Sequence, residues 1–166
     1  MMRRIAPLLA LALTACGLHP LYAGGTSGTV AMTLRTVKVA PIEGQVGWLV
    51  RNKLVDRLGE SGSASPQYRL DVKLDDNITG FGIRGDRAVT RERRTLRARY
   101  QLVNLSSGST VLDATAGSDA GIDVVSSEYA TIAAENSALE RLSDIVADEI
   151  VARVALYAQR TSAPAK

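Results

Sequence analysis

The sequence contains a single cysteine and a single histidine, and this scarcity limits the chemistry that the chain can perform. Cys16 cannot form a disulfide within one molecule. His19 lies close to it, so no Ser–His or Cys–His pair can be assembled from the remainder of the chain. A zinc site would need carboxylates alone, which is an uncommon donor set. The sequence therefore predicts a protein that is not an enzyme and holds no metal or other cofactor.

Aromatic residues and long apolar runs are also scarce. The chain has one Phe, one Trp and five Tyr, and beyond its N-terminal run no segment approaches the length of a membrane span. Its formal net charge is +3. Setting aside Arg3 and Arg4, which belong to the leader described next, lowers this to about +1. Such a balanced domain is not expected to bind nucleic acid.

The N-terminus reads MMRRIAPLLALALTAC and has the pattern of a bacterial lipoprotein leader. A cationic head precedes an apolar run that is too short to span a bilayer. The run ends in Leu13-Thr14-Ala15-Cys16, an aliphatic residue and two small residues before a cysteine. Small residues let a signal peptidase bind the peptide in extended form, and the thiol accepts a diacylglycerol. We expect residues 1–15 to be removed and Cys16 to carry the lipid, with acyl chains that each contribute ~0.8 kcal/mol per buried methylene.

Periodicity divides the rest of the chain into a tether, one domain and a tail. Residues 16–29 include AGGTSGT and are expected to form a lipidated, flexible tether. The domain is expected over residues 30–160, and residues 161–166 as a disordered tail. Within the domain, alternating apolar residues predict a strand over residues 30–39, ended by Pro41. Apolar spacings of three and four then predict a helix from Glu43 to Gly59, with Gly59 as its C-terminal cap.

The second half of the domain predicts three strands and a long helix. Strict alternation indicates a strand over residues 68–75, and the glycines of residues 77–87 indicate a wide hairpin tip. A second strand is expected over residues 88–105 and a third over residues 110–116, with a small-residue loop reaching Ser127. Ser126 or Ser127 would cap a helix that runs to about Arg160. These elements predict an α+β fold, a two-layer sandwich of about four strands with two helices on one face.

One segment is strongly polarised in charge. Residues 84–99 hold seven arginines and two acidic residues, whereas residues 100–140 contain no Lys or Arg. Arginine matches the geometry of phosphate and carboxylate groups, so a phosphate-bearing lipid is a natural ligand for an envelope protein. The alternative is a solvated strand face in which Asp71 and Asp75 pair with some arginines. The candidate ligand-binding residues are those nearest the hairpin tip, namely Arg84, Arg87, Arg91, Arg93 and Arg94.

An ordered series of motifs runs through nearly all of the mature chain, starting at Cys16-Gly17-Leu18-His19-Pro20-Leu21-Tyr22. Its further elements are the helix pattern at Val50, Leu54 and Leu58, then Tyr68-Arg69-Leu70-Asp71-Val72, a glycine-bearing loop ending in Arg84, Tyr100-Gln101-Leu102, Ser107-Gly108, and Tyr129-Ala130 at the start of an Ala-rich helix. In this combination and order the chain resembles the LptE family of lipopolysaccharide-assembly lipoproteins.

The resemblance implies a function at the outer membrane. Members of this family are lipid-anchored on its periplasmic face, plug the large β-barrel LptD and assist delivery of lipopolysaccharide to the outer leaflet. The family is also thought to bind lipopolysaccharide through basic residues, and Arg84 matches such a position. An alternative is an auxiliary lipoprotein of a periplasmic phospholipid-trafficking ABC system, a class that also combines a lipobox with a small α/β domain.

Replacing Cys16 by alanine should block lipidation. The Cys16→Ala precursor is expected to keep its leader and gain no acyl chains, because the acceptor thiol is absent. Intact-mass measurement of wild type and variant checks this directly. A wild-type mature protein without acyl mass on its N-terminus would contradict the lipobox assignment.

Overall fold

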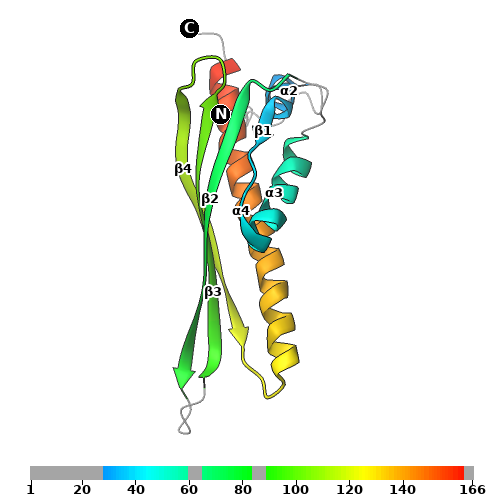
Figure 1. The fold of residues 1–166 in the computed structure, drawn as a ribbon, viewed down its shortest axis with the longest axis vertical. Helices are drawn as coiled ribbons and strands as arrows, with labels where there is room; N and C mark the ends of the chain where they lie inside the picture. The colour runs from blue at the N-terminus through cyan, green and yellow to red at the C-terminus, as the bar shows by residue number, and fades with distance from the viewer. Residues whose placement is uncertain (1–27, 60–64, 84–88, 163–166) are drawn as a thin grey trace, which may run out of the picture.

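Three long strands and one long helix dominate the structure (Figure 1). The computed structural model describes residues 28–59, 65–83 and 89–162, so the expected leader and nearly all of the expected tether lie outside the described residues. The elements in chain order are α2 (Thr29–Arg35), β1 (Val37–Val39), α3 (Gly44–Leu58), β2 (Tyr68–Ile83), β3 (Val89–Asn104), β4 (Thr110–Asp123) and α4 (Glu128–Ser162).

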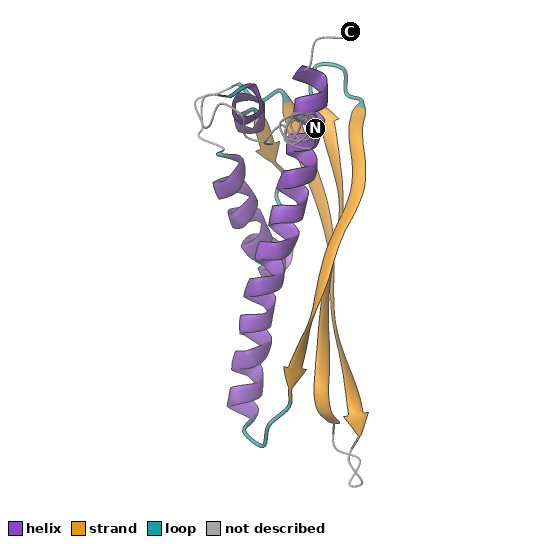
Figure 2. Cartoon of the chain, turned by 180° about the vertical axis from the view of Figure 1, so that it is seen from behind, coloured by secondary structure: helices purple, strands orange, loops and turns teal. Residues whose placement is uncertain are grey.

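The strands form one mixed sheet in the order β1-β2-β3-β4. β1 pairs in parallel with the start of β2, with Val37 opposite Tyr68. β2, β3 and β4 are joined as consecutive antiparallel hairpins, the second through a turn with Gly108 at φ 70°. All of the described helices lie against one face of this sheet (Figure 2). The predicted α+β two-layer sandwich is therefore confirmed.

The core lies between the sheet and the helices. One face of each strand supplies apolar side chains, because successive residues of a strand point to opposite sides. Leu70 on β2 and Leu96 and Tyr100 on β3 are fully buried against the helices. From the helices, the buried side chains of the core include Val50, Leu54, Leu58, Leu142, Val146, Ile150 and Val154.

The two helices of the core differ in length, and only α4 runs along the whole sheet. α3 covers the half of the sheet near β1, whereas the half that carries the β2–β3 tip faces α4 alone (Figures 1 and 2). α3 ends at Gly59, whose φ of 68° gives the left-handed cap predicted from the sequence. Half-exposed ion pairs join the two helices, with Lys53 Nζ 2.7 Å and Arg57 Nη2 2.9 Å from Asp144 Oδ1.

The strand predicted over residues 30–39 is wrong in its first half. Residues 29–35 form the helix α2, and only Val37–Val39 are a strand. Val30 and Leu34 lie one helical turn apart and both pack on the core, whereas Met32, which the alternation placed beside them, is 53% exposed. Spacings of two and four coincide over so short a segment, so the pattern did not separate the two structures.

The strand predicted over residues 88–105 agrees with β3, but the other two predicted strands of this half were too short. β2 continues through Ile83 and β4 through Asp123, so most of the expected tip at residues 77–87 and much of the expected loop after Ala116 are sheet. Glycines suggested turns there, but pairing with β3 holds Gly80, Gly117 and Gly121 in the sheet, whereas Gly82, also within β2, has a positive φ, of 78°. At Gly117 a Cβ would lie 3.2 Å from Arg97 Cγ and from Leu96 O, so glycine permits a close approach of two strands.

α4 is confirmed, but it extends further than expected. Ser127 Oγ accepts a hydrogen bond from the Ala130 N–H at 3.4 Å, as its predicted capping role requires. The helix reaches Ser162, so the first two residues of the predicted tail are helical. Residues 163–166 lie outside the described residues.

A polar cluster replaces apolar packing where α4 alone covers the sheet. Arg94 of β3 is only 8% exposed, and its Nε lies 2.9 Å from Asp76 Oδ1 on β2. Its Nη1 donates to the Glu135 carbonyl oxygen of α4, also at 2.9 Å. One guanidinium thus ties two strands to the helix. Because the pair is largely buried, loss of either partner would leave a charge without compensation.

Glu92 lies on the same side of β3 and has no such partner. Its Oε2 is buried without a hydrogen bond. Burial, together with the nearby carboxylate of Glu135, raises the pKa of Glu92 above its usual range. The folded protein therefore binds this proton more tightly than the unfolded chain. Stability falls as the pH rises from the ordinary glutamate pKa, about 4.3, through the raised value.

Glu92→Gln should raise the melting temperature at neutral pH, because it removes a charge that the fold disfavours. The gain should shrink as the pH is lowered, since wild-type Glu92 becomes protonated. Thermal melts at several pH values check this, with Glu140→Gln on an exposed part of α4 as the control. A variant that melts below wild type at every pH would contradict the assignment.

Candidate functional site

The outer face of the sheet carries a row of arginines paired with carboxylates. Arg91 Nε lies 2.9 Å from Asp123 Oδ1, and Arg99 Nη2 lies 3.1 Å from Asp113 Oδ2. Hydrogen bonds from Arg99 and Gln101 hold the pKa of Asp113 below its usual range. The partners come from β4 because its register places these carboxylates opposite or beside the β3 arginines. Much of the arginine charge is therefore balanced across the sheet.

The expected partners on β2 are not the ones that the structure uses. Asp71 is held by Arg69 of its own strand, with Nε and Oδ1 2.9 Å apart. Asp75 lies opposite Arg97 in the register, but no ion pair joins them. The alternation had placed these side chains on the correct face. It could not show that β4 continues far enough to bring Asp119 and Asp123 beside the arginines.

Two of the candidate arginines, Arg91 and Arg93, lie on the outer face close to the hairpin tip. Arg93 is the more weakly paired, at 3.7 Å from Asp119 Oδ2, and its guanidinium lies 5.5 Å from the ring centre of Phe81. Both guanidiniums are well exposed, with Arg91 at 63% and Arg93 at 59%. Arg84 and Arg87 follow β2 in the sequence and lie outside the described residues.

Arg94, the remaining candidate, lies apart from the other described arginines. It is on the inner face, in the polar cluster with Asp76 and α4, so its guanidinium is not presented with Arg91 and Arg93. The alternation of side chains along β3 could have predicted that Arg94 lies on the other face of the sheet. Arg94 has the parity of the buried Leu96, whereas Arg91 and Arg93 have the opposite parity.

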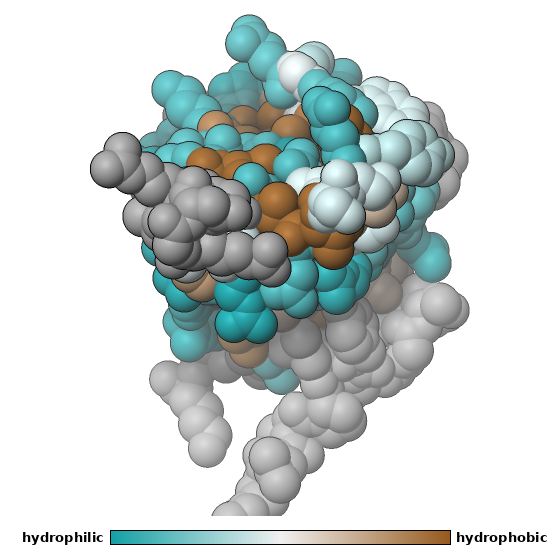
Figure 3. Space-filling model, turned by 90° about the horizontal axis from the view of Figure 1, so that it is seen from below, coloured by the Kyte–Doolittle hydropathy of each residue, from teal (hydrophilic) through white to brown (hydrophobic). Residues whose placement is uncertain are grey.

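Exposed apolar side chains gather at the same end of the molecule, and sequence reasoning missed them. They lie on the last part of β2, on the β4–α4 loop and on the first turns of α4, and Figure 3 shows apolar surface at this end amid hydrophilic residues. Tyr129 is the most exposed, at 84%. The set is Ile78, Phe81, Val125, Tyr129 and Ile132. The sequence did offer one indication, because Ile78, Phe81 and Val125 are apolar residues inside segments that were expected to be loops.

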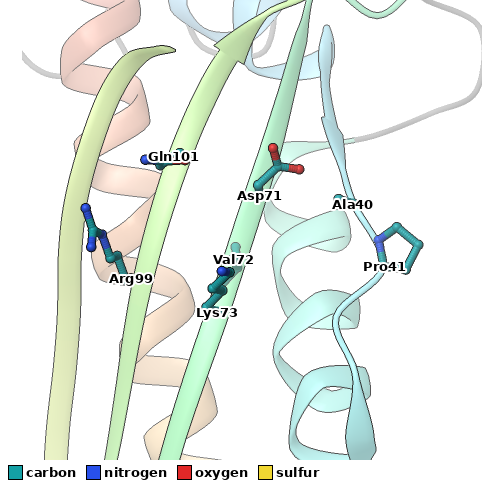
Figure 4. Close-up of a pocket in the computed structure, with 7 residues that line it drawn as sticks. All are labelled: Ala40, Pro41, Asp71, Val72, Lys73, Arg99 and Gln101. Carbon is teal, nitrogen blue, oxygen red and sulfur yellow. The ribbon is translucent and has the colours of Figure 1, made fainter.

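A hollow on the outer face lies nearer to β1 and offers little free charge. Its volume is about 320 Å³, and Figure 4 shows its lining residues on β2, β3 and the chain after β1, namely Ala40, Pro41, Asp71, Val72, Lys73, Arg99 and Gln101. Asp71, Arg99 and Gln101 are already paired with neighbours on the sheet. Lys73 is its one cation without an ion pair among the described residues. The tip end is therefore the better candidate for an anionic ligand.

Within residues 28–59, 65–83 and 89–162, no group of His, Cys, Asp and Glu could hold a metal ion. None of the helices in this part of the chain combines the length and the apolar character that a membrane span requires.

Several solved structures share this fold. A protein from Caulobacter crescentus described as a lipoprotein matches with a TM-score of 0.66 and 22% identity, over 78% of this chain and 96% of its own. Rare lipoprotein B from Shewanella oneidensis matches with a TM-score of 0.59 and 11% identity, over 76% and 98%. Lipoprotein B from Nitrosomonas europaea gives 0.56 and 9%, over 74% and 82%. At such identities the likeness establishes the fold.

A comparison with curated proteins finds no match. A comparison with family models does, and it covers most of the chain. The model described as LptE, lipopolysaccharide-assembly, matches residues 34–154, from the end of α2 through all four strands and most of α4. The family resemblance noted in the sequence is confirmed by this match. The chain belongs to the LptE family of lipopolysaccharide-assembly proteins.

Proposed function

We propose that this protein is an outer-membrane lipoprotein that plugs and helps to assemble an LptD-like β-barrel and assists lipopolysaccharide transport to the outer leaflet. In this proposal Cys16 carries the lipid anchor and the domain faces the periplasm. The observation that carries the proposal is the family match over residues 34–154. The role is one of binding and assembly rather than catalysis, since the family is described by assembly and not by a reaction.

The tip end of the domain supports direct binding of lipopolysaccharide. The ligand combines phosphates with acyl chains, and this end combines arginines with exposed apolar side chains. Arg91 and Arg93 extend from the outer face, while Ile78 and Ile132 lie toward the inner side. Phe81 joins the two kinds of surface, because it is 40% exposed and contacts Arg93. Arg84 and Arg87 complete the proposed phosphate-binding set from the sequence.

The existing ion pairs do not prevent this binding. Exposed pairs such as Arg93–Asp119 contribute about 0–1 kcal/mol. A charge-assisted hydrogen bond from arginine to phosphate contributes about 1.5–3 kcal/mol. Phosphate can therefore displace the carboxylate from Arg93 at a net gain. Arg94 is not part of this exchange, because its largely buried pair with Asp76 also anchors α4.

The barrel partner should be recoverable from membranes. Purification of the lipidated protein in mild detergent is expected to yield a large outer-membrane β-barrel, identified by mass, and depletion of the protein should lower the yield of assembled barrel. Cys16→Ala serves as the control for anchoring. Recovery of an inner-membrane ABC transporter in place of a barrel would overturn the proposal.

Reversing the arginines at the tip should weaken lipopolysaccharide binding. Both Arg84→Asp/Arg87→Asp and Arg91→Asp/Arg93→Asp are expected to lower the affinity at least about tenfold, because each removes two phosphate contacts. The measurement is the affinity of the purified protein for lipopolysaccharide at two salt concentrations.

A matched control separates this site from general charge. Arg97→Asp/Arg99→Asp makes the same charge change on the same face of β3, further from the tip, and should bind nearly as wild type. Melting curves establish that each variant is folded. Wild-type affinity in both tip variants, or binding that does not respond to salt, would show that the arginines form only a solvated strand face.

A further inference from the structure

A groove lies between the start of β4 and the last turns of α4, at the opposite end of the sheet from the arginine tip. Its volume is about 380 Å³. The end of α4 runs beside the sheet in both views of the chain (Figures 1 and 2). Apolar side chains from both elements line it together with polar groups, among them Arg153 and Arg160 of α4 and Asp113 of β4, whose carboxylate is already paired with Arg99.

The β4 strand beside this groove is an open edge. β4 pairs with β3 alone, so its other side has no strand partner. The Gly117 N–H points away from β3, toward Glu149 Oε2 at 3.2 Å. Because the direction of backbone groups alternates along an antiparallel strand, the N–H groups of Asp113 and Thr115 point the same way. Glu149 thus protects the middle of the edge and leaves residues 110–115 available.

This stretch also has little that would protect an edge, because its one charged side chain, Asp113, is paired with Arg99 of the neighbouring strand. The sequence of residues 110–115 is TVLDAT, without lysine or proline. Lysine and proline on an edge strand discourage pairing with another chain. An extended segment laid along this stretch would receive hydrogen bonds from β4 and would place alternate side chains in the groove.

The charge of the groove indicates which side chains an added strand would carry. Arg153 and Arg160 lie two helical turns apart, and neither makes an ion pair with a described residue. Arg153 lies beside Tyr100, whose pKa is raised by burial and partly lowered again by this guanidinium. Arginines without a carboxylate partner beside an open strand edge favour acidic side chains on whatever pairs there.

We propose that this groove binds an extended, acidic segment of a partner protein, which pairs with β4 as an added strand and directs carboxylates to Arg153 and Arg160. A second copy of this chain fits poorly, because the groove side of its own β4 offers Leu112, Ala114 and Ala116. The site goes beyond the proposed lipopolysaccharide contact, and the two can be occupied together because they lie at opposite ends of the sheet.

The test uses the full-length protein and three short labelled peptides. One alternates threonine and glutamate, the second alternates threonine and lysine, and the third is the acidic peptide with proline at alternate positions. The acidic peptide should bind at least about tenfold more tightly than the other two. It should also slow hydrogen exchange at the backbone N–H groups of Asp113 and Thr115, since these would donate to the added strand.

Charge reversal makes the result specific to the groove. Arg153→Glu/Arg160→Glu should lower the affinity for the acidic peptide by about tenfold or more and should raise the affinity for the lysine peptide. The raised affinity shows that the variant is folded. Arg35→Glu/Arg141→Glu, on exposed parts of α2 and α4, is the matched control and should bind as wild type.

Four outcomes would overturn the inference. They are equal binding of acidic and lysine peptides, equal binding of the proline peptide, protection on β2 instead of β4, and protection of β4 by dimerisation of the protein alone. None of these outcomes changes the expected lipopolysaccharide affinity or barrel recovery, so the proposed function is tested independently of this inference.

Discussion

The match in length between α4 and the β2–β3 hairpin is the constraint on which the rest of the structure depends. A helix of 35 residues spans about 52 Å, and a strand of 16 residues spans about 53 Å. A hairpin of this length with one wet face is not stable alone, and only a helix of equal reach can cover it. Buried alanines along α4, namely Ala138, Ala147, Ala155 and Ala158, allow its neighbours to approach it closely.

The shorter α3 divides the molecule into two unlike ends. Where α3 and α4 both cover the sheet, the interior is apolar and fully buried around Leu54 and Tyr100. Where α4 acts alone, Arg94 ties the sheet to the helix through charge and hydrogen bonds, and one carboxylate oxygen of Glu92 is buried without a hydrogen bond. Several apolar side chains there, Tyr129 among them, stay well exposed. Because a single helix covers this end of the sheet, exposed apolar side chains and exposed arginines lie there together.

The sequence was sufficient for elements whose signal is local and long. The face of α3, its Gly59 cap and the Ser127 cap of α4 follow from spacing and capping chemistry, and the structure confirms them. The predictions of the strand ends and of α2 were wrong. At the strand ends, glycine-rich segments such as Gly117–Gly121 are held extended by pairing with β3, which no local pattern encodes. For the same reason, the carboxylates of β4 were not identified as partners of the arginines, although parity alone separates Arg94 from Arg93.

Pairing across the sheet also explains how so many arginines can share one strand. Unbalanced guanidiniums on alternate residues of β3 would repel one another along the outer face, and the β4 carboxylates remove most of that cost. Because these pairs are exposed, they neutralise the face but are individually weak, so a stronger anion can replace the carboxylate. The buried Arg94–Asp76 pair behaves oppositely, since breaking it would expose an uncompensated charge inside the fold. A single arginine-rich strand therefore carries both an exchangeable outer surface and a fixed inner anchor, and burial alone distinguishes them.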